Sequence, residues 1–164
     1  MTELQLSIGS NIENRFEFLK QACQLIEIQL GKITSYSKVY ETPAWGFVST
    51  PFYNACISVQ TQKNTKEALA ILQEIEKEIG RTPKKGKAYE ARPIDLDIIY
   101  SSEGIFNYPH LTVPHPLLQE RKFVLVPLLD IYNHKHPLLH QNTHELLNSC
   151  NDVSEIKATS LSLA

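Results

Sequence analysis

The chain has 164 residues, of which 42% are hydrophobic and 21% are charged, and its formal charge is −2. This length suits one domain, and the composition excludes a disordered chain and a strongly basic nucleic-acid binder. No apolar run approaches the ~20 residues that cross a bilayer, and residues 1–10 lack the pattern of a secretory signal. Three scattered cysteines without a Cys-x-x-Cys pair fit a reducing compartment. We therefore expect a cytoplasmic, single-domain protein (residues 1–164) that has no disulfides and binds neither nucleic acid nor membranes. We also expect it to be a monomer.

The N-terminal region predicts a strand followed by an amphipathic helix. Residues 3–8 alternate polar and apolar side chains, as a strand with one buried face does, and Gly9 should end this strand. Ser10 and Glu13 have the spacing of a capping box, so a helix should begin there. The helix should end at Gly31, after apolar residues whose spacing of three and four positions gives it one buried face.

The middle of the chain predicts two further strands and a second helix. Residues 33–41 and 53–61 are rich in strand-forming residue types, and the loop between them contains two prolines and a glycine. A helix with a single apolar stripe should begin after Asn64 and end at Gly80. Residues 94–100, IDLDIIY, then form a strand so rich in isoleucine that we expect it at the centre of the sheet.

The C-terminal part is less regular. Residues 123–131 are strongly apolar and belong to the core, as a helix or as a strand. Residues 134–144 contain four histidines, which we interpret as surface residues, and the tail beyond about residue 150 should fray. The element order β-α-β-β-α-β predicts an α+β fold with a ferredoxin-like sheet and its helices on one face.

Asp95 and Asp97 are the chemically most informative residues. Side chains two residues apart on a strand point to the same face, so these two carboxylates should lie side by side. Carboxylate oxygens are the ligands that Mg²⁺ prefers, and Mg²⁺ commonly binds substrate phosphates at the same time. The alternative is an exposed strand face with two solvated acids.

Residues 81–92 form a basic segment just before this strand. Five of them are Lys or Arg and one is Glu, which gives a local charge of +4 on an otherwise acidic chain. Such a segment suits a compact polyanion such as a nucleoside triphosphate, and Arg81 and Arg92 can each grip phosphate oxygens with two donors. The alternative is a solvated loop that keeps the protein soluble.

Other residues suit a flat heterocycle or a phosphate. Trp45 and Phe52 belong to the aromatic loop before the strand 53–61, and Asn54 can offer both a donor and an acceptor to an amide-like ring edge. His115 lies between two prolines, which would hold its imidazole in place as a donor to phosphate. The alternatives are an apolar cluster under the loop and a structural histidine.

Together these segments resemble the 6-hydroxymethyl-7,8-dihydropterin pyrophosphokinase family. The resemblance rests on SIGSN at 7–11, YETPAWG at 40–46, FYNACISVQT at 52–61, EIEKEIGR at 74–81, ARPIDLDII at 91–99 and LTVPHPLLQERKFVLVPL at 111–128. It implies a three-layer α/β/α arrangement around the ferredoxin-like sheet. It also implies an enzyme of folate biosynthesis that transfers the pyrophosphoryl group of ATP to the hydroxymethyl oxygen of the pterin and leaves AMP.

The resemblance further implies the roles of single residues. Asp95 and Asp97 would hold two Mg²⁺ ions and, with Arg81 and Arg92, carry the catalysis. The positions that match the ATP site are Gln73, Glu76, Arg81, Lys85, Arg92, Ile98, Thr112, His115 and Arg121. The positions that match the pterin site, in which Phe123 would stack on the ring, are Thr42, Pro43, Trp45, Phe52, Asn54 and Phe123.

The chain departs from the family pattern in the basic segment. The common R-W-G-P-R reads AYEAR at 88–92, so Ala88 replaces an arginine and Tyr89 a tryptophan. A lysine does not reproduce the two-donor grip of arginine. The missing charge can nevertheless come from one of three neighbours, Lys84, Lys85 or Lys87.

Two other interpretations of the sequence stay open. One is a different Mg²⁺-dependent nucleotidyl- or phosphotransferase with an Asp-x-Asp metal site. The other is a non-catalytic ferredoxin-like module that binds a nucleotide.

Overall fold

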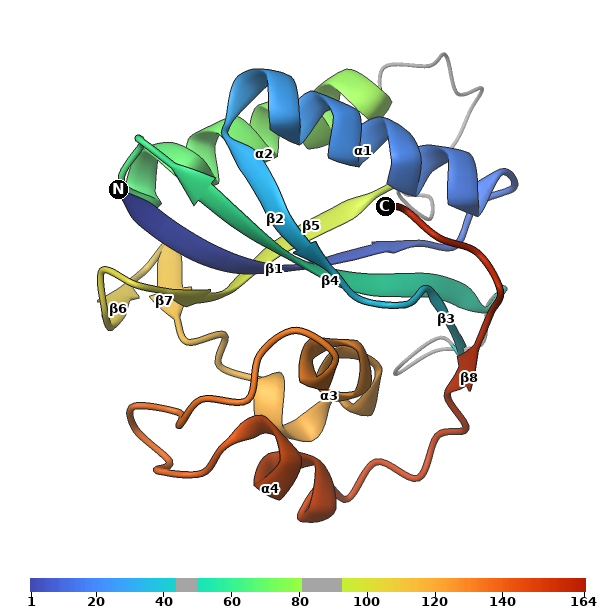
Figure 1. Ribbon diagram of the computed structural model, residues 1–164, viewed down its shortest axis with the longest axis vertical. Helices are drawn as coiled ribbons and strands as arrows, with labels where there is room; N and C mark the ends of the chain where they lie inside the picture. The colour runs from blue at the N-terminus through green and yellow to red at the C-terminus, as the bar shows by residue number, and fades with distance from the viewer. Residues whose placement is uncertain (44–49, 81–92) are drawn as a thin grey trace.

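The computed structural model describes residues 1–43, 50–80 and 93–164 (Figure 1). Residues 44–49 and 81–92 lie outside the described residues. The roles expected for Trp45, Arg81, Lys85 and Arg92 therefore stay predictions.

An antiparallel sheet forms the middle of the molecule. Its strands are β1 (Thr2–Ser10), β2 (Lys32–Tyr36), β3 (Tyr40–Thr42), β4 (Phe52–Thr61), β5 (Asp95–Ser101) and β8 (Lys157–Ala158). The strand order is β5-β1-β4-β3-β8, and β2 pairs with β4 alongside β3. The path β5-β1-β4-β2 is the strand order of a ferredoxin-like βαββαβ unit, so the predicted fold class is confirmed.

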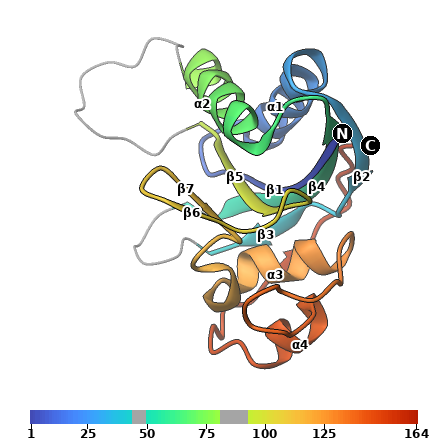
Figure 2. The same ribbon diagram turned by 90° about the vertical axis from the view of Figure 1, so that its left-hand side faces the viewer.

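Helices cover both faces of this sheet. On one face lie α1 (Arg15–Gln29) and α2 (Thr65–Gly80), and on the other lie α3 (Lys122–Leu129) and α4 (Thr143–Asn148) (Figure 2). The hairpin of β6 (Phe106–Tyr108) and β7 (Leu111–Val113) and a short 3-10 helix (Leu118–Glu120) lead from β5 to α3. The result is the three-layer arrangement that the family resemblance implies, whereas the residue pattern alone predicted helices on one face.

Each face of the sheet has its own apolar layer because strand side chains alternate between the faces. Leu4, Leu6 and Ile8 of β1 are fully buried against the α1–α2 layer. Cys56 of β4 and Ile99 of β5 belong to the smaller layer under α3 and α4. Burial of apolar surface in these two layers is the main favourable term in folding.

The start of α1 differs from the prediction. The first helix begins at Arg15, and its N-cap is Asn14, whose φ of 69° is in the left-handed region and whose side chain makes no capping hydrogen bond. Ser10 is part of β1, opposite Tyr53 of β4, and Gly9 does not end the strand. The capping-box expectation was wrong because pairing with β4 holds Ser10 in extended backbone.

Two strand predictions also change. Residues 33–41 form the separate strands β2 and β3 rather than one strand. Strand β5 pairs only with β1 among the described strands, so it lies at an edge of the sheet and the predicted central position was wrong. The strand is nevertheless apolar because helices cover both of its faces. Ile98 belongs to one apolar layer and Ile99 to the other.

Two further predictions concern the C-terminal part, the apolar segment and the histidines. The apolar segment 123–131 is mainly helical, since α3 runs from Lys122 to Leu129. The histidines of 134–144 are not all surface residues, because His136 is 4% exposed and its Nδ1 accepts the backbone N–H groups of Leu138 and Leu139. Within the described residues, no cluster of three or more His, Cys, Asp or Glu side chains could hold a metal ion.

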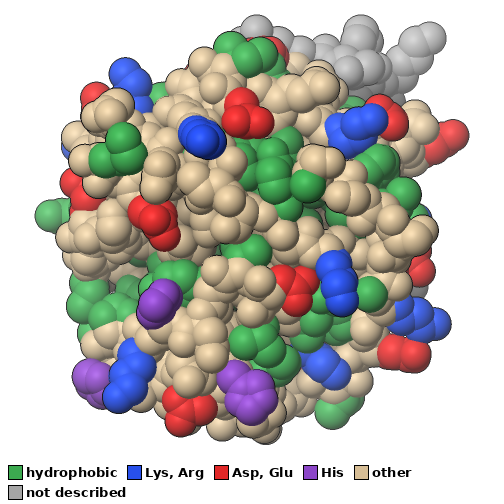
Figure 3. Space-filling model, in the orientation of Figure 1, with side chains coloured by type: hydrophobic (Ala, Val, Ile, Leu, Met, Phe, Trp, Pro, Cys, Tyr) green, Lys and Arg blue, Asp and Glu red, His purple; other side chains and the backbone are tan. Residues whose placement is uncertain are grey.

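The surface is mixed in character. On the face seen in Figure 3, acidic and basic side chains are scattered among apolar ones, and histidines gather towards the end where α4 lies in Figure 1. Among the described helices, none is both long enough and apolar enough to span a bilayer.

Candidate active site

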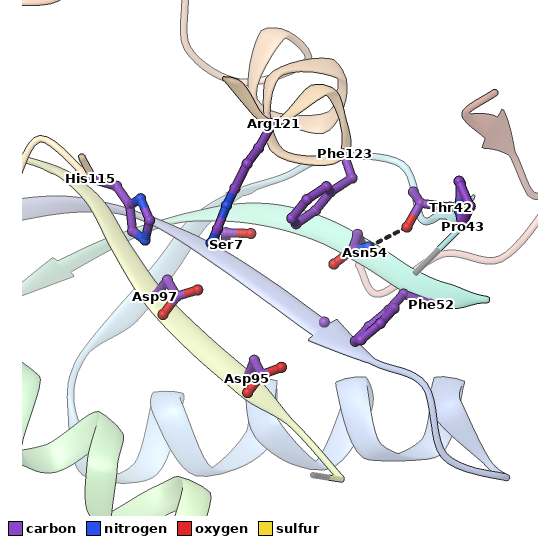
Figure 4. Close-up of a pocket in the computed structure, with 11 residues that line it drawn as sticks. Ser7, Thr42, Pro43, Phe52, Asn54, Asp95, Asp97, His115, Arg121 and Phe123 are labelled. Carbon is purple, nitrogen blue, oxygen red and sulfur yellow. Dashed lines mark hydrogen bonds between the residues drawn. The ribbon is translucent and has the colours of Figure 1, made fainter. Parts of the chain in front are cut away.

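One cavity opens on the α3 side of the sheet, near the ends of β1, β4 and β5. Its volume is about 310 Å³, and Figure 4 shows its walls. The lining residues are Ser7, Gly9, Thr42, Pro43, Phe52, Asn54, Asp95, Asp97, His115, Arg121 and Phe123. Nine of these eleven residues were predicted as site residues from the sequence.

The cavity lies at the end of the sheet face where β1 ends and β4 and β5 begin. Asp95, Gly9 and Asn54 form one row across β5, β1 and β4, because Gly9 pairs with both neighbours. The next row is Asp97, Ser7 and Cys56, in which Cys56 already belongs to the apolar layer under α3. The strand register thus brings the two carboxylates and the amide to one surface.

Asn54 is held by its neighbours. It is 4% exposed, and its Nδ2 donates a hydrogen bond to Thr42 Oγ1 at 2.6 Å. A Cβ atom on Gly9 would lie 2.4 Å from Asn54 Oδ1, so the absence of a side chain at Gly9 makes room for the amide. These contacts leave Oδ1 over Gly9, on the cavity side of the sheet.

Asp95 and Asp97 point into the same cavity from β5, as their spacing predicts (Figure 4). Both are partly buried. Leu96, between them, points the other way, and its backbone N–H donates to Glu76 Oε2 of α2 at 2.8 Å. This hydrogen bond fixes the beginning of β5 against α2.

His115 is a neutral imidazole in this structure at pH 7. Burial, and then the positive charge of Arg121, lowers the pKa of His115 to about 4. Its Nδ1 accepts the backbone N–H of Leu117 at 3.2 Å, so Nε2 carries the proton. Pro114 and Pro116 restrict the backbone on both sides of His115, and the backbone N–H of His115 donates to Ile99 O at 3.0 Å.

Arg121 and Phe123 come from the beginning of α3. The Arg121 guanidinium carbon lies 5.6 Å from the centre of the Phe123 ring, within the range of a cation–π contact. In Figure 4 Arg121 points down towards Ser7, while Phe123 faces the Asn54 end. The cavity therefore has a polar end with His115 and Arg121 and an aromatic end with Phe52 and Phe123.

A second, smaller cavity of about 240 Å³ adjoins the first and shares Asp97 and His115 with it. Ile98 and Thr112 line this second cavity. A third groove, between α2 and the β6–β7 hairpin, shares His110 and Leu111 with the second and includes Gln73. A connected surface thus runs from the carboxylates to the predicted nucleotide residues on α2 and β7.

The structure brings most of the predicted residues together, with one exception among the described ones. Glu76 lines none of these three cavities, and its carboxylate binds the backbone of β5 instead. Two lining residues, Ser7 and Gly9, were not singled out individually, although both belong to the SIGSN motif. A possible signal was that Ser7 and Gly9 stand at alternate positions, which places them on the strand face opposite Leu6 and Ile8.

Comparison with known proteins identifies the family. A family model for 7,8-dihydro-6-hydroxymethylpterin-pyrophosphokinase (HPPK) matches residues 5–133, which is most of the chain. The chain belongs to this family. It is therefore an enzyme, a diphosphokinase that uses ATP to pyrophosphorylate hydroxymethyldihydropterin in folate biosynthesis. Family membership decides against the two other interpretations left open by the sequence.

Bacterial relatives match over nearly their whole length. A 2-amino-4-hydroxy-6-hydroxymethyldihydropteridine pyrophosphokinase of Porphyromonas gingivalis is 39% identical over 140 residues, which are 84% of this chain and 95% of that protein. The protein of the same name in Aquifex aeolicus is 35% identical over 140 residues, 84% of this chain and 86% of its own length.

Longer relatives contain a similar region. A folate synthesis bifunctional protein of Pisum sativum is 38% identical over 130 residues, which are 79% of this chain and 25% of that protein. A solved Plasmodium falciparum HPPK-DHPS chain superposes with a TM-score of 0.75 at 17% identity and covers 90% of this chain. This chain spans 43% of that solved chain, and the likeness supports the three-layer fold.

Proposed function

We propose that pyrophosphoryl transfer takes place in the 310 Å³ cavity, with the pterin at the Asn54 end and the phosphates of ATP at the Asp95–Asp97 end. One observation carries this assignment: two carboxylates, a buried amide and two phenylalanine rings line the same cavity. A transfer between a flat amide-containing ring and a polyphosphate needs these groups within reach of one another. The neighbouring cavity with Ile98 and Thr112 then takes the nucleoside part of ATP.

Asp95 and Asp97 are suited to hold two Mg²⁺ ions. Both carboxylates are partly buried and face one cavity, and oxygen ligands are what Mg²⁺ prefers. The described residues offer no third carboxylate or histidine in a metal-binding cluster with them. That donor set fits Mg²⁺, which usually keeps sites for phosphate oxygens and water. When bound, the ions would neutralise the charge of the phosphates during transfer.

The proposed pterin end of the cavity would bind the edge of the pterin ring by hydrogen bonds and the two faces of the ring by aromatic contacts. Asn54 Oδ1 can accept a ring N–H, because its Nδ2 is already oriented by Thr42. Phe52 and Phe123 approach the cavity from β4 and α3, and an aromatic ring could stack on Phe123 in the cavity that the carboxylates also line (Figure 4). Thr42 and Pro43 complete this end, and Trp45 is assigned here from the family pattern alone.

The phosphate end would act by charge and orientation. Neutral His115 can donate from Nε2, and Arg121 brings a permanent positive charge to the same wall. Arg81, Lys85 and Arg92, which lie outside the described residues, are assigned to the phosphates, and Gln73 to the nucleotide. The assignment of Glu76 to the nucleotide rests on the family pattern alone, because its carboxylate binds the backbone of β5 here. The pterin hydroxyl then attacks the β-phosphorus in line and AMP leaves, and we assign no general base.

A product assay tests this function. The protein is incubated with ATP, Mg²⁺ and 6-hydroxymethyl-7,8-dihydropterin, and the nucleotides are separated. We expect AMP only when the pterin is present. Formation of ADP would mean ordinary phosphoryl transfer and would overturn the proposed reaction.

Two variants test the two ends of the cavity. Asp97→Ala should lower kcat by at least about a hundredfold while the melting temperature stays close to wild type, because a metal ligand rather than a core group is lost. Glu17→Ala, which removes a surface carboxylate of α1, is the matched control. A near-wild-type rate for Asp97→Ala would refute the metal assignment.

The second variant tests the other end of the cavity: Asn54→Ala should raise the KM for the pterin more than the KM for ATP.

We also propose that the chain is a single pyrophosphokinase domain that acts as a monomer in the cytoplasm. Both apolar layers share one sheet, which supports a single folding unit. Burial raises the pKa of Cys23 to about 12, so this thiol stays protonated and is poorly reactive. Light scattering after size exclusion should give the mass of one chain, and a dimer mass would contradict the monomer.

A further inference from the structure

We infer that Arg15 is a positioning residue for pterin binding, which acts on the pterin site from the opposite face of the sheet. Arg15 is the first residue of α1, and α1 lies on the face away from the cavity. The inference rests on the proposed pterin site, because its effect would be exerted through Thr42, Phe52 and Asn54.

The Arg15 guanidinium contacts one residue of β3, one residue of β4 and the residue just before β4. Its Nη1 donates to the carbonyl oxygen of Pro51 at 2.7 Å, and its Nη2 donates to Glu41 Oε2 at 3.2 Å. Its Cζ atom lies 3.8 Å from the centre of the Tyr53 ring, which is a close cation–π contact. One planar group therefore fixes a main-chain carbonyl, a carboxylate and an aromatic ring at once.

Each of these partners is the chain neighbour of a residue that lines the cavity. Glu41 precedes Thr42, Pro51 precedes Phe52, and Tyr53 lies between Phe52 and Asn54. Neighbouring strand residues point to opposite faces. Arg15 thus holds the backbone whose other side chains form the pterin end of the cavity.

The register of the two strands makes this coupling direct. Glu41 pairs with Tyr53 and Thr42 pairs with Phe52 in the β3–β4 ladder. Strand β3 has only three residues, so few ladder hydrogen bonds define its position on β4. Arg15 adds a second connection between the strands, next to the hydrogen bond from Asn54 to Thr42.

The contacts require an arginine rather than a positive charge alone. The Arg15 side chain is 20% exposed and that of Glu41 is 41% exposed, and a partly solvated ion pair of this kind contributes little to stability. A lysine ammonium lacks the planar fork that serves two acceptors while stacking on a ring. The geometry points to orientation of β3 and β4 as the main effect of Arg15.

Lys20 supplies a matched control in the same helix. Its ammonium lies 3.8 Å from a Glu17 carboxylate oxygen and 5.6 Å from the centre of the Phe16 ring. It makes two of the three kinds of contact that Arg15 makes, an ion pair and a cation–π contact, but only within α1. Replacing Lys20 removes a cation of α1 without touching β3 or β4.

The test compares steady-state kinetics of Arg15→Met, Arg15→Lys, Glu41→Gln and Lys20→Met, with Asn54→Ala as the reference for the pterin site. For Arg15→Met we expect the KM for the pterin to rise by about tenfold or more, because small displacements of positioning groups are costly in this way. The KM for ATP should change less than twofold. Arg15→Lys and Glu41→Gln should shift the pterin KM in the same direction, and Lys20→Met should leave both constants unchanged.

The outcomes separate this inference from the proposed function. If Asn54→Ala raises the pterin KM and neither Arg15→Met nor Glu41→Gln does, the positioning role of Arg15 is wrong. If Arg15→Lys matches wild type, charge alone suffices and the inference is also wrong. If Asn54→Ala itself has no effect on the pterin KM, the pterin site is misassigned. Should Arg15→Met be too unstable to assay, Glu41→Gln decides, because it removes only the partly exposed partner.

Discussion

Gly9 shows how one small residue shapes the cavity. It lies between Asp95 and Asn54 in the sheet, and its missing side chain leaves room for the Asn54 amide. The neighbouring atom is part of a buried, hydrogen-bonded side chain, so it cannot move away without losing the contact with Thr42. A methyl group at this position would therefore disturb the site directly.

We expect Gly9→Ala to raise the KM for the pterin and to lower the free energy of unfolding by about 1–3 kcal/mol, as overpacking typically does. Urea denaturation and steady-state kinetics measure the two effects. Gly80→Ala is the control, because a Cβ atom at Gly80 meets no atom within 4 Å and should be neutral or slightly stabilising in α2. Equal behaviour of the two variants would contradict the steric account of Gly9.

In the absence of ligands, His115 should make the free energy of unfolding depend on pH. Its folded-state pKa is lowered to about 4, whereas the pKa in the unfolded chain is about 6.5. Below pH 6.5 the unfolded state binds a proton that the folded state does not bind, so this group favours unfolding as the pH falls towards 4. Above pH 6.5 the imidazole is neutral in both states, so His115 no longer favours unfolding.

The matching experiment follows the melting temperature from pH 7.5 to 4.5, without ATP or Mg²⁺, for the wild type and His115→Gln. The wild type should lose stability more steeply between pH 6.5 and 4.5 than the variant, since glutamine does not titrate. Parallel curves would show that His115 is not kept neutral by the fold.

At the scale of elements, the position of α3 matters because this helix forms one wall of the cavity. Asp130, just after α3, accepts a hydrogen bond from Tyr40 Oη at 2.8 Å and one from the backbone N–H of Lys38 at 3.1 Å. Tyr40 belongs to β3 and is 7% exposed, and burial together with the hydrogen bond to Asp130 raises the pKa of its hydroxyl. These contacts connect the helix that carries Phe123 to the strand that carries Thr42.

Tyr40→Phe should lower the free energy of unfolding by about 1–2 kcal/mol, because it removes a hydrogen bond to a charged acceptor that is itself partly solvated. Chemical denaturation should show a lower midpoint with an unchanged slope. Tyr108→Phe, at a residue that is 64% exposed, provides the control and should change the midpoint little. A Tyr40→Phe midpoint equal to that of wild type would mean that the connection does not stabilise the fold.

At the scale of the whole molecule, the C-terminal segment passes from the α4 layer to the α1–α2 layer around the β3 edge of the sheet (Figure 1). Asp152 accepts the backbone N–H of Lys122, β8 pairs with β3, and Thr159 donates to Val39 O. Leu161 and Leu163 then pack, partly buried, against the core between the sheet and the α1–α2 layer. Fraying of this tail stays a prediction from its sequence, and these contacts favour a docked tail instead.

Removing residues 151–164 tests this point. We expect a loss of about 2–4 kcal/mol in the free energy of unfolding, from the two leucines and the strand pairing. The double variant Leu161→Ser/Leu163→Ser should reproduce a large part of it without shortening the chain. A truncated protein with the wild-type melting temperature would support a frayed tail.

Much of the molecule could be predicted from sequence because the signals were local. The strands and helices followed from spacings of two, three and four residues, and Asp95 and Asp97 share a face because a strand alternates. The family motifs then assigned Asn54, His115, Arg121 and Phe123, all of which line the cavity. The start of α1 and the position of β5 were mispredicted because strand pairing, which is long-range, overrode the local pattern.

The sequence by itself determined the order of the elements, the family and the chemical types of the site residues. Only the tertiary structure decided which residues are neighbours: Gly9 lies between Asp95 and Asn54, Arg15 supports β3 and β4, and Glu76 binds the backbone of β5. The physical reason is that strand register and layer packing depend on the total apolar burial of distant segments. No short window of residues contains that information.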